Sequence, residues 1–533
     1  ALEDLPQPLV NLVLTAMSRP ARLGITYNSQ DQTRGAFGVG VVASLLTTGQ
    51  AQANEIHGAV SAMIAAGAPP FESKASAEYA GMTEMFLPVG LLRYGPREAN
   101  GRTTWEMHFG SVTDPDAAFA ALPSGAPGVT GKFEPVLRAR LDPAPLTPLL
   151  NMGRMMAAGT PGVEAIDAVI AAGIVGPEAV KYSFQFGYTE DASVGVWVLE
   201  GVKRYAQKWG LGTEPLSDAE INAIPADATV AGIIALDPSV LIDLLAEVKK
   251  QEPDVGRGLA RFAAQTGVDL ERDVLAALGG RVTMYMSEST GGAGLTSGVL
   301  LVSLKEPARL RGALSKLSSM ANAAMAQHPE IKGRIRAREW EHDGMTFSTL
   351  IFPGLPVPLE ITCSITDGHL LAALTPQAAV IGARQAMGKG GKGLLSNPAF
   401  REGLVSGRRP VAVSFVDTAR VMSSGYPYVV AMGSALANAV RSPMGADREP
   451  GLIVPPLNEL REGVRPRVGC TYWEGENLVS VTRGNRSLLV EACAVMGAAE
   501  PMLRAAGGMM GGMMGAVREA HERRRMQRWR EWE

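Results

Sequence analysis

The chain has 533 residues, of which 46% are hydrophobic, 19% are charged and 6% are aromatic, and its formal net charge is −3. This composition is typical of a globular protein long enough for several domains, and it excludes a disordered or fibrous chain. The small net charge and the scarcity of aromatic residues also argue against a nucleic-acid-binding surface.

In chain order, the first expected elements are a strand at Arg22–Tyr27 and a second strand within Gly38–Ser44. The apolar run Ala36–Leu46, followed by Ala51-Gln52-Ala53, also imitates a signal peptide with its cleavage site. We favour the strand, because Gly38–Ser44 aligns with a second apolar run at Gly298–Ser303.

A strand followed by an acidic residue and a helix recurs along the chain. In Ala226–Leu245, the side chain of Asp237 can cap the first helical turn and Pro238 suits the first helical position. Asp142-Pro143 repeats this arrangement, and Asp417-Thr418 is a weaker version. Capping explains these aspartates, so no catalytic role is assigned to them.

Hairpins form the second recurring unit. Val180–Tyr188 alternates between aromatic residues and Lys181, Ser183 and Gln185, a pattern typical of a half-buried strand that returns at Val194–Leu199. Asp367-Gly368 is a strong hairpin signal between two alternating runs. Further hairpins are expected at Arg281–Met286 with Val299–Leu304 and at Arg467–Tyr472 with Leu478–Thr482.

The order of these units indicates an internal duplication. Arg22–Tyr27 returns as Arg281–Met286, and Pro135–Leu146 returns as Pro410–Val421, in the same order along the chain. We therefore predict an α+β fold of two tandem duplicated halves, each an antiparallel sheet of hairpins with helices packed on one face.

The predicted boundaries follow from this duplication. The first half covers residues 1–210, a linker covers 211–225, the second half covers 226–500, and a Gly/Met-rich segment with a charged helical tail covers 501–533. The first half lacks a counterpart of the strand–helix unit Ala226–Leu245, and that counterpart is expected before Ala1.

No motif establishes an enzymatic, metal-binding or cofactor-binding site. Glu339, Glu341, His342 and Asp343 form the densest group of potential metal ligands, and an exposed polar turn is the favoured interpretation. Gly388–Gly393 contains lysines but lacks the strand–loop–helix context of a phosphate-binding loop, so a solvated surface loop is expected. We therefore assign no catalytic, cofactor or metal residues, and no cofactor.

Cysteine usage gives no metal or redox motif either. Cys363, Cys470 and Cys493 are widely separated and form no C-x-x-C pair. They are interpreted as small buried apolar residues, with a Cys470–Cys493 disulfide left open. No strongly apolar stretch of about 18 residues occurs, so no transmembrane helix is expected.

The C-terminal tail is the candidate partner-binding segment. Its methionines could dock in a groove of a partner, and its arginines and tryptophans could contact an acidic protein or an anionic lipid surface. A solvated terminal helix is the alternative. The residues concerned are Met509, Met510, Met513, Met514, Arg523, Arg524, Arg525, Trp529 and Trp532.

A pattern in the sequence indicates a cellular location by its resemblance to a known family. Leu236-Asp237-Pro238, Asp273–Arg281 and Val302–Pro307, with Asp367-Gly368-His369 downstream, follow a strand–helix–hairpin–helix pattern. The pattern resembles an uncharacterised family of bacterial envelope proteins, a domain of unknown function of similar length. Members are typically exported or lipid-anchored, which implies an envelope or periplasmic location here. The resemblance brings no catalytic residues.

We consider three functions of different classes for this chain. The leading hypothesis is a non-enzymatic envelope protein that binds or scaffolds other proteins, including copies of itself, with peripheral membrane contact through the tail and no nucleic acid. The first alternative is a carrier of lipids or other hydrophobic ligands, which predicts an apolar pocket of several hundred Å³. The second is a hydrolase of unrecognised type, which predicts a nucleophile and a base within hydrogen-bond reach.

Overall fold

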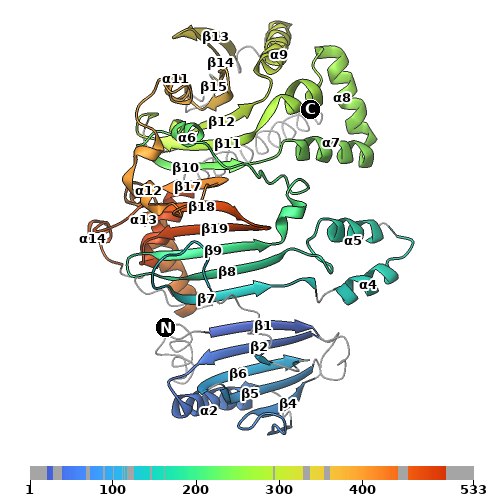
Figure 1. Ribbon diagram of the computed structural model, residues 1–533, viewed down its shortest axis with the longest axis vertical. Coiled ribbons are helices and arrows are strands. Elements are labelled where there is room, and N and C mark those ends of the chain that lie inside the picture. The colour runs from blue at the N-terminus through green and yellow to red at the C-terminus, as the bar shows by residue number, and fades with distance from the viewer. Residues whose placement is uncertain are drawn as a thin grey trace, which may run out of the picture. The chain divides into compact units, whose positions relative to one another are not determined.

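The computed structural model in Figure 1 describes most of the chain. The described residues are 21–27, 39–67, 72–87, 90–99, 101–110, 112, 115–116, 125–144, 147–160, 162–291, 294–327, 336–352, 360–441 and 454–499. They divide into two compact units. Unit 1 takes its described residues from 1–209, 434–452 and 471–483, and unit 2 takes them from 210–433, 453–470 and 484–533.

Unit 1 contains a six-stranded antiparallel sheet in the order β1-β2-β6-β5-β4-β3. A helix, α2, follows the first hairpin. The bounds are β1 Ala21–Tyr27, β2 Val39–Leu46, α2 Gln50–Gly67, β3 Ser73–Ala75, β4 Thr83–Leu87, β5 Gly90–Ala99 and β6 Arg102–Gly110. The run that imitates a signal peptide thus contributes the strand β2 and the start of α2.

The helix α2 covers one face of this sheet, as Figure 1 shows beside β5 and β6. Ile56 and Val60 of α2 pack against Leu45, Tyr94 and Trp105, and all five side chains are buried. Because residues of a strand alternate between its faces, Arg93, Glu106 and their alternating neighbours lie on the side away from α2.

A second run of strands in unit 1 has the order β19-β9-β8-β7. The helical hairpin α4–α5 connects β7 to β8 and projects beyond the ends of these strands in Figure 1. The bounds are β7 Glu134–Leu141, α4 Thr147–Met156, α5 Gly162–Ala171, β8 Lys181–Tyr188, β9 Ser193–Glu200 and the short helix η3 Val202–Tyr205. The hairpin of β18 (Arg467–Glu474) and β19 (Asn477–Gly484) has residues in both units.

Unit 2 contains antiparallel strands in the order β13-β14-β15-β16-β12-β11-β10-β17. The strands are β10 Ala228–Ala235, β11 Leu278–Ser287, β12 Val299–Leu304, β13 Arg336–His342, β14 Met345–Ile351, β15 Glu360–Ile365, β16 His369–Ala373 and β17 Ala412–Val416. The helices are α6 Asp218–Asn222, α7 Ser239–Gln251, α8 Pro253–Thr266, α9 Pro307–Gln327, α11 Pro376–Ala386, α12 Pro398–Gly403, α13 Thr418–Arg441 (which continues into unit 1) and α14 Leu457–Leu460.

Small residues let α11 pack closely on the strands of unit 2. Ala378, Ala379 and Ala383 are buried, and a Cβ atom at Gly382 would lie 2.9 Å from the Cγ1 atom of Val299. The large side chains of this core come from the strands and from α12, and include Ile233, Tyr285, Leu301, Phe347, Leu371, Phe400 and Phe415. The core therefore lies on the α11 side of these strands.

Residues 211–225, which the sequence analysis assigns to a linker, are packed into unit 2. Leu216, Ile221 and Ile224 belong to its buried core, and the Leu216 amide donates to the carbonyl oxygen of Pro410. The Ser217 side chain caps α6 in a capping box with Glu220. The polar residues of this segment thus form and cap a short helix.

The predicted α+β class with antiparallel sheets is confirmed. At the start of α7 the Ser239 amide donates to Asp237 Oδ1 at 3.0 Å, as expected. The Ala144 amide likewise donates to Asp142 Oδ1 at 3.1 Å, but α4 begins only at Thr147. Cys470 and Cys493 are both buried and form no disulfide. Among the described helices, none combines the length and the apolar character needed to cross a bilayer.

Candidate functional site

The predicted partner-binding residues of the tail, from Met509 to Trp532, lie outside the described residues. The expected counterpart of Ala226–Leu245 before Ala1 lies outside them as well. The candidate site is therefore built from the surfaces of the described residues.

The group of potential metal ligands is a polar turn. Asp343 has a φ of 53° at the β13–β14 turn, and its carboxylate accepts a 2.6 Å hydrogen bond from Arg384 Nε of α11. That hydrogen bond holds the pKa of Asp343 below its ordinary value. Within the described part of the chain, no three His, Cys, Asp or Glu side chains gather as a metal site.

An exposed aromatic surface lies on the β7–β9 strands of unit 1. Tyr182, Phe184, Phe186 and Tyr188 alternate along β8, and Trp197 of β9 lies opposite Phe184 in the strand register. The two rings of that pair have centroids 4.2 Å apart. On β7, Leu137 and Leu141 lie opposite Phe186 and Tyr182. We call these seven residues the aromatic face.

The aromatic face is the more open side of the strands. Trp197 is 52% exposed, Leu137 is 47% exposed and Leu141 is 56% exposed. The four aromatic side chains of β8 are half-buried, whereas Ser183 and Gln185 between them are buried. This burial is unusual, because apolar side chains are normally the buried ones.

Several polar groups are paired on the covered side of the same strands, although Gln185 Oε1 and Arg138 Nε are buried there with no hydrogen-bond partner among the described residues. Gln185 Nε2 donates to the carbonyl oxygen of Gly125, and Arg140 Nη2 lies 2.7 Å from Glu200 Oε2. Val194, Val196 and Val198 of β9 fill the rest of this side. Since residues of a strand alternate between its faces, the covered side carries Arg138, Arg140, Lys181 and Glu200, whereas Glu134 lies opposite Tyr188 at one end of the aromatic face.

A second exposed apolar surface is the tip of the α4–α5 hairpin. Met155 is 72% exposed and Met156 is 81% exposed, next to the exposed Met152. A hollow of about 800 Å³ lies beside them and is also lined by Arg154, Thr160, Val163 and Glu164. Exposed methionines on a helix are adaptable contact residues.

A buried charge network lies on the face of the six-stranded sheet opposite α2. Glu106 accepts a 2.9 Å hydrogen bond from His108 Nε2 and lies 3.3 Å from Arg97 Nη1. In the adjacent strands, Glu84 Oε1 accepts a 2.8 Å hydrogen bond from Arg93 Nε. Glu84, Arg93, Glu106 and His108 are each less than a tenth exposed.

The network explains the direction of two pKa shifts. Burial raises the pKa of Glu106, but the hydrogen bond from His108 and the charge of Arg97 together hold it below its ordinary value. Burial likewise raises the pKa of Glu84. Hydrogen bonds from Ser76 and Arg93 outweigh this effect, so the pKa of Glu84 also lies below its ordinary value. Both carboxylates are therefore stabilised in the charged form, which is the structural role expected of a paired buried charge.

One hydroxyl–imidazole contact bears on the hydrolase hypothesis. Thr83 Oγ1 lies 3.4 Å from His57 Nε2, and burial lowers the pKa of His57. His57 Nδ1 is buried with no hydrogen-bond partner. The pair therefore lacks the third group that orients the imidazole in a catalytic triad.

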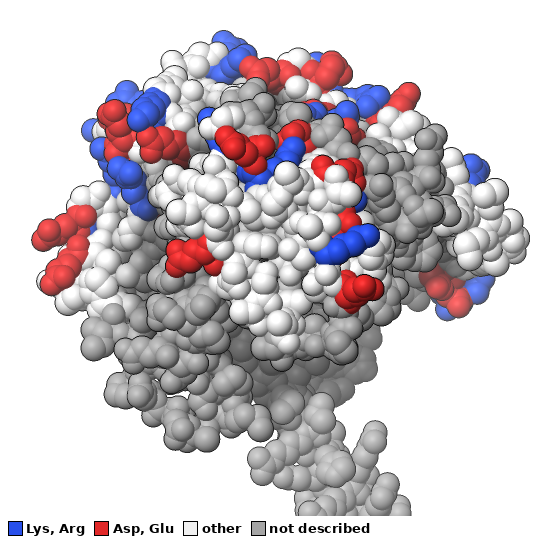
Figure 2. All heavy atoms as spheres, turned by 90° about the horizontal axis from the view of Figure 1, so that it is seen from below, with Lys and Arg blue, Asp and Glu red and all other residues white. Residues whose placement is uncertain are grey.

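The described part of the face drawn in Figure 2 carries charges of both signs. On the face that Figure 2 draws, basic and acidic side chains lie interspersed among uncharged ones. The described part of that face therefore lacks the single sign of charge that a polyanion-binding surface has.

Comparisons with known proteins identify no relative. No family model, no curated protein and no solved structure matches the chain. The resemblance to a bacterial envelope family therefore stays a prediction.

Proposed function

We propose that this chain is a non-enzymatic binding protein that acts through protein–protein contacts, with the aromatic face as its main docking surface. The observation that carries the proposal is the reversed burial of β8. Its aromatic side chains stay half-exposed while Ser183 and Gln185 are covered. A contiguous exposed apolar surface with aromatic residues at its centre is typical of an interaction site.

The composition of the aromatic face favours a protein partner. Tyr, Trp and Phe are enriched at the cores of protein interfaces, and charged residues are depleted there.

The carrier alternative predicts an apolar pocket. Two hollows in the described part of the chain have mixed linings, since one includes Arg154 and Glu164 and the other includes Lys389 and Lys392.

Unit 2 offers a second apolar surface on the side of its strands away from α11. Ile234, Met284, Leu300 and Leu350 are exposed there, on β10, β11, β12 and β14. Met284 pairs with Gly232 on one side and with Leu300 on the other, so part of this surface is continuous across three strands. Two apolar sheet surfaces in one chain suit a scaffold that holds more than one partner, or copies of itself.

We also propose that the chain contains a tandem duplication. Two strand orders support it: β1-β2-β6-β5-β4-β3 in unit 1 and β11-β12-β16-β15-β14-β13 in unit 2 follow the same pattern along the chain. In both cases a helix, α2 or α9, follows the first hairpin. Superposition of the two sets of strands in an experimental structure tests this part, and different strand paths would contradict it.

We further propose that the protein is located in the bacterial cell envelope. Only the sequence resemblance supports this location. Fractionation of the native source into cytoplasm, periplasm and membranes tests it, with cytosolic and periplasmic marker enzymes as controls. Recovery with the cytosolic marker alone would contradict it.

Photo-crosslinking tests the docking surface. A photoreactive amino acid at Trp197, in cells of the native source, should crosslink the chain to a protein. The same amino acid at Lys305, an exposed position of unit 2, is the control. Crosslinks recovered only with lipid would favour the carrier alternative, and no crosslink specific to position 197 would contradict both.

A further inference from the structure

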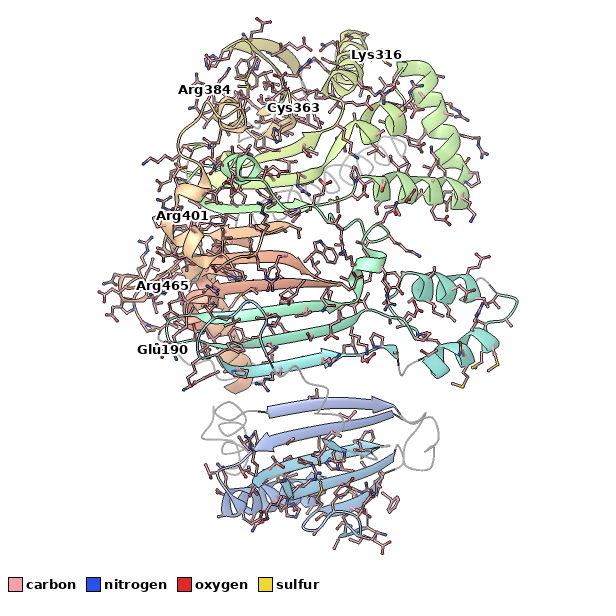
Figure 3. The ribbon with its side chains drawn as sticks, viewed as in Figure 1. Glu190, Lys316, Cys363, Arg384, Arg401 and Arg465 are labelled. Carbon is pink, nitrogen blue, oxygen red and sulfur yellow. The ribbon has the colours of Figure 1, made fainter. Side chains whose placement is uncertain are left out.

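A second hollow, with a volume of about 550 Å³, lies in unit 2 between the end of α11 and the residues that precede β10. Four residues of the loop Gly388–Gly393, namely Lys389, Gly390, Gly391 and Lys392, line this hollow, although sequence alone predicts a solvated surface loop. The lining residues that matter here are Asp227, Ser289, Arg384, Lys389, Gly391 and Lys392. Arg384, on α11, is labelled in Figure 3.

The loop is held in one conformation by close packing. A Cβ atom at Gly390 would lie 2.8 Å from the Cα atom of the buried Gln385, and one at Gly393 would lie 2.6 Å from the Cα atom of Asn222. The Ala226 amide donates to the carbonyl oxygen of Lys392 at 2.8 Å. These contacts fix the loop to the segment before β10, so its amides have defined positions.

The loop presents hydrogen-bond donors that the rest of unit 2 does not use. The amino groups of Lys389 and Lys392 form no ion pair with any described residue, and the amides of Gly390 and Gly391 donate to no described acceptor. A Cβ atom at Gly391 would have nothing within 4 Å, so there is open space on the Cβ side of this residue. Two lysines and consecutive free amides are the elements of an anion-binding loop.

The other side of the hollow carries an acceptor. Asp227 Oδ2 accepts a 2.8 Å hydrogen bond from the Ser289 amide, and Oδ1 accepts one of 3.1 Å from the Ser289 hydroxyl. No cation of the described residues pairs with this carboxylate. Each of its oxygens retains a second lone pair for a hydroxyl donor.

We propose that this hollow binds a phosphate ester that also carries hydroxyl groups, of the sugar-phosphate class. The phosphate would lie against the amides of Gly390 and Gly391 between Lys389 and Lys392, and a hydroxyl would donate to Asp227. The lysines lie on one side of the hollow and the carboxylate of Asp227 lies on the other. A ligand with both a phosphate and hydroxyl groups would bind both sides, whereas a simple anion would bind only the lysine side.

Calorimetric titration with ribose 5-phosphate tests the proposal, with ribose and inorganic phosphate as matched probes. Ribose 5-phosphate should bind more tightly than either. The double variant Lys389→Ala/Lys392→Ala should weaken it by at least about tenfold. Gly391→Val, at a position where a Cβ atom would meet nothing within 4 Å, should also weaken binding of ribose 5-phosphate by blocking the amides. Added salt should weaken the wild-type interaction.

Lys305→Ala, an exposed lysine of unit 2 outside the hollow, should leave binding unchanged, and thermal unfolding of each variant should show that it is folded. The proposal is overturned if ribose 5-phosphate does not bind at millimolar concentration, or if the folded double variant binds it as tightly as the wild-type chain. Binding no tighter than that of inorganic phosphate would overturn the assignment of a hydroxyl-bearing ester.

Discussion

Phe184 of β8 and Trp197 of β9 lie directly opposite each other, with ring centroids 4.2 Å apart, on the side of the strands that stays partly exposed. The contact orients the indole without burying it. A side chain that is already ordered loses little conformational freedom when a partner covers it, which is the property of an interface hot spot.

Removal of the indole should cost little stability. We expect Trp197→Ala to lower the free energy of unfolding by about 1 kcal/mol, because the lost cross-strand aromatic contact is half-solvated. Phe347→Ala, at a fully buried ring stacked on Trp340, should lower it by about 3–5 kcal/mol. Urea denaturation measures both, and equal losses would contradict the assignment of Trp197 to an open surface.

The buried charge network should be sensitive to the loss of one partner. We expect Glu106→Ala to lower the free energy of unfolding by about 3–5 kcal/mol, because it leaves Arg97 and His108 without their shared carboxylate. Glu98→Ala, at an exposed position of the same strand as Arg97, should change it by less than about 0.5 kcal/mol. A loss no larger for Glu106→Ala than for Glu98→Ala would argue against a paired, desolvated carboxylate.

Stability should fall on the acid side in two stages. The pKa of His57 and that of His369 are lowered by burial, so the folded state binds fewer protons than the unfolded state and loses stability as the pH falls below the ordinary value of 6.5. The pKa values of Glu84 and Glu106 are also below their ordinary value of 4.5, so a further loss should follow below that pH.

Denaturation curves between neutral pH and about pH 3 measure this dependence. Glu106→Gln should flatten the second stage, because the amide cannot take up a proton. A curve for this variant that parallels the wild-type curve would show that Glu106 does not contribute to the acid loss.

Adjacent glycines of the loop should respond differently to the same substitution. We expect Gly390→Ala to lower the free energy of unfolding by about 1–3 kcal/mol, because its Cβ atom would overlap Gln385. Gly391→Ala should be close to neutral, since open space surrounds that position. Thermal unfolding of the two variants checks the order, and equal melting temperatures would mean that Gln385 moves aside.

Local chemistry in the sequence accounts for the elements. The alternation of Val180–Tyr188 identifies β8, Asp367-Gly368 identifies the β15–β16 hairpin, and Asp237 identifies the start of α7. Each of these signals acts over a few residues, which is why it can be read from sequence.

What the sequence could not supply is which side of a strand is covered. The alternation separates Phe184 from Ser183 and Gln185 but does not say that the polar pair is the buried one, because burial depends on what packs there. Gln185 is covered in part by the segment at Gly125, some sixty residues earlier in the chain. The hollow beside Gly391 depends in the same way on the distant Asp227 and Ser289. For the buried charges of β5 and β6, the even spacing of Arg93 with Arg97 (i, i+4) and of Glu106 with His108 (i, i+2), which places each pair on one face of its strand, was an available signal.

The most direct test of the central claim compares partner capture by two exposed aromatic positions of unit 1. Trp197 belongs to the aromatic face, and Phe86, which is 60% exposed on β4, does not. We predict that affinity-tagged Trp197→Ala, expressed in the native source, loses the proteins retained by the wild-type chain, while Phe86→Ala retains them. Equal retention by both variants, at unchanged stability, would contradict the account.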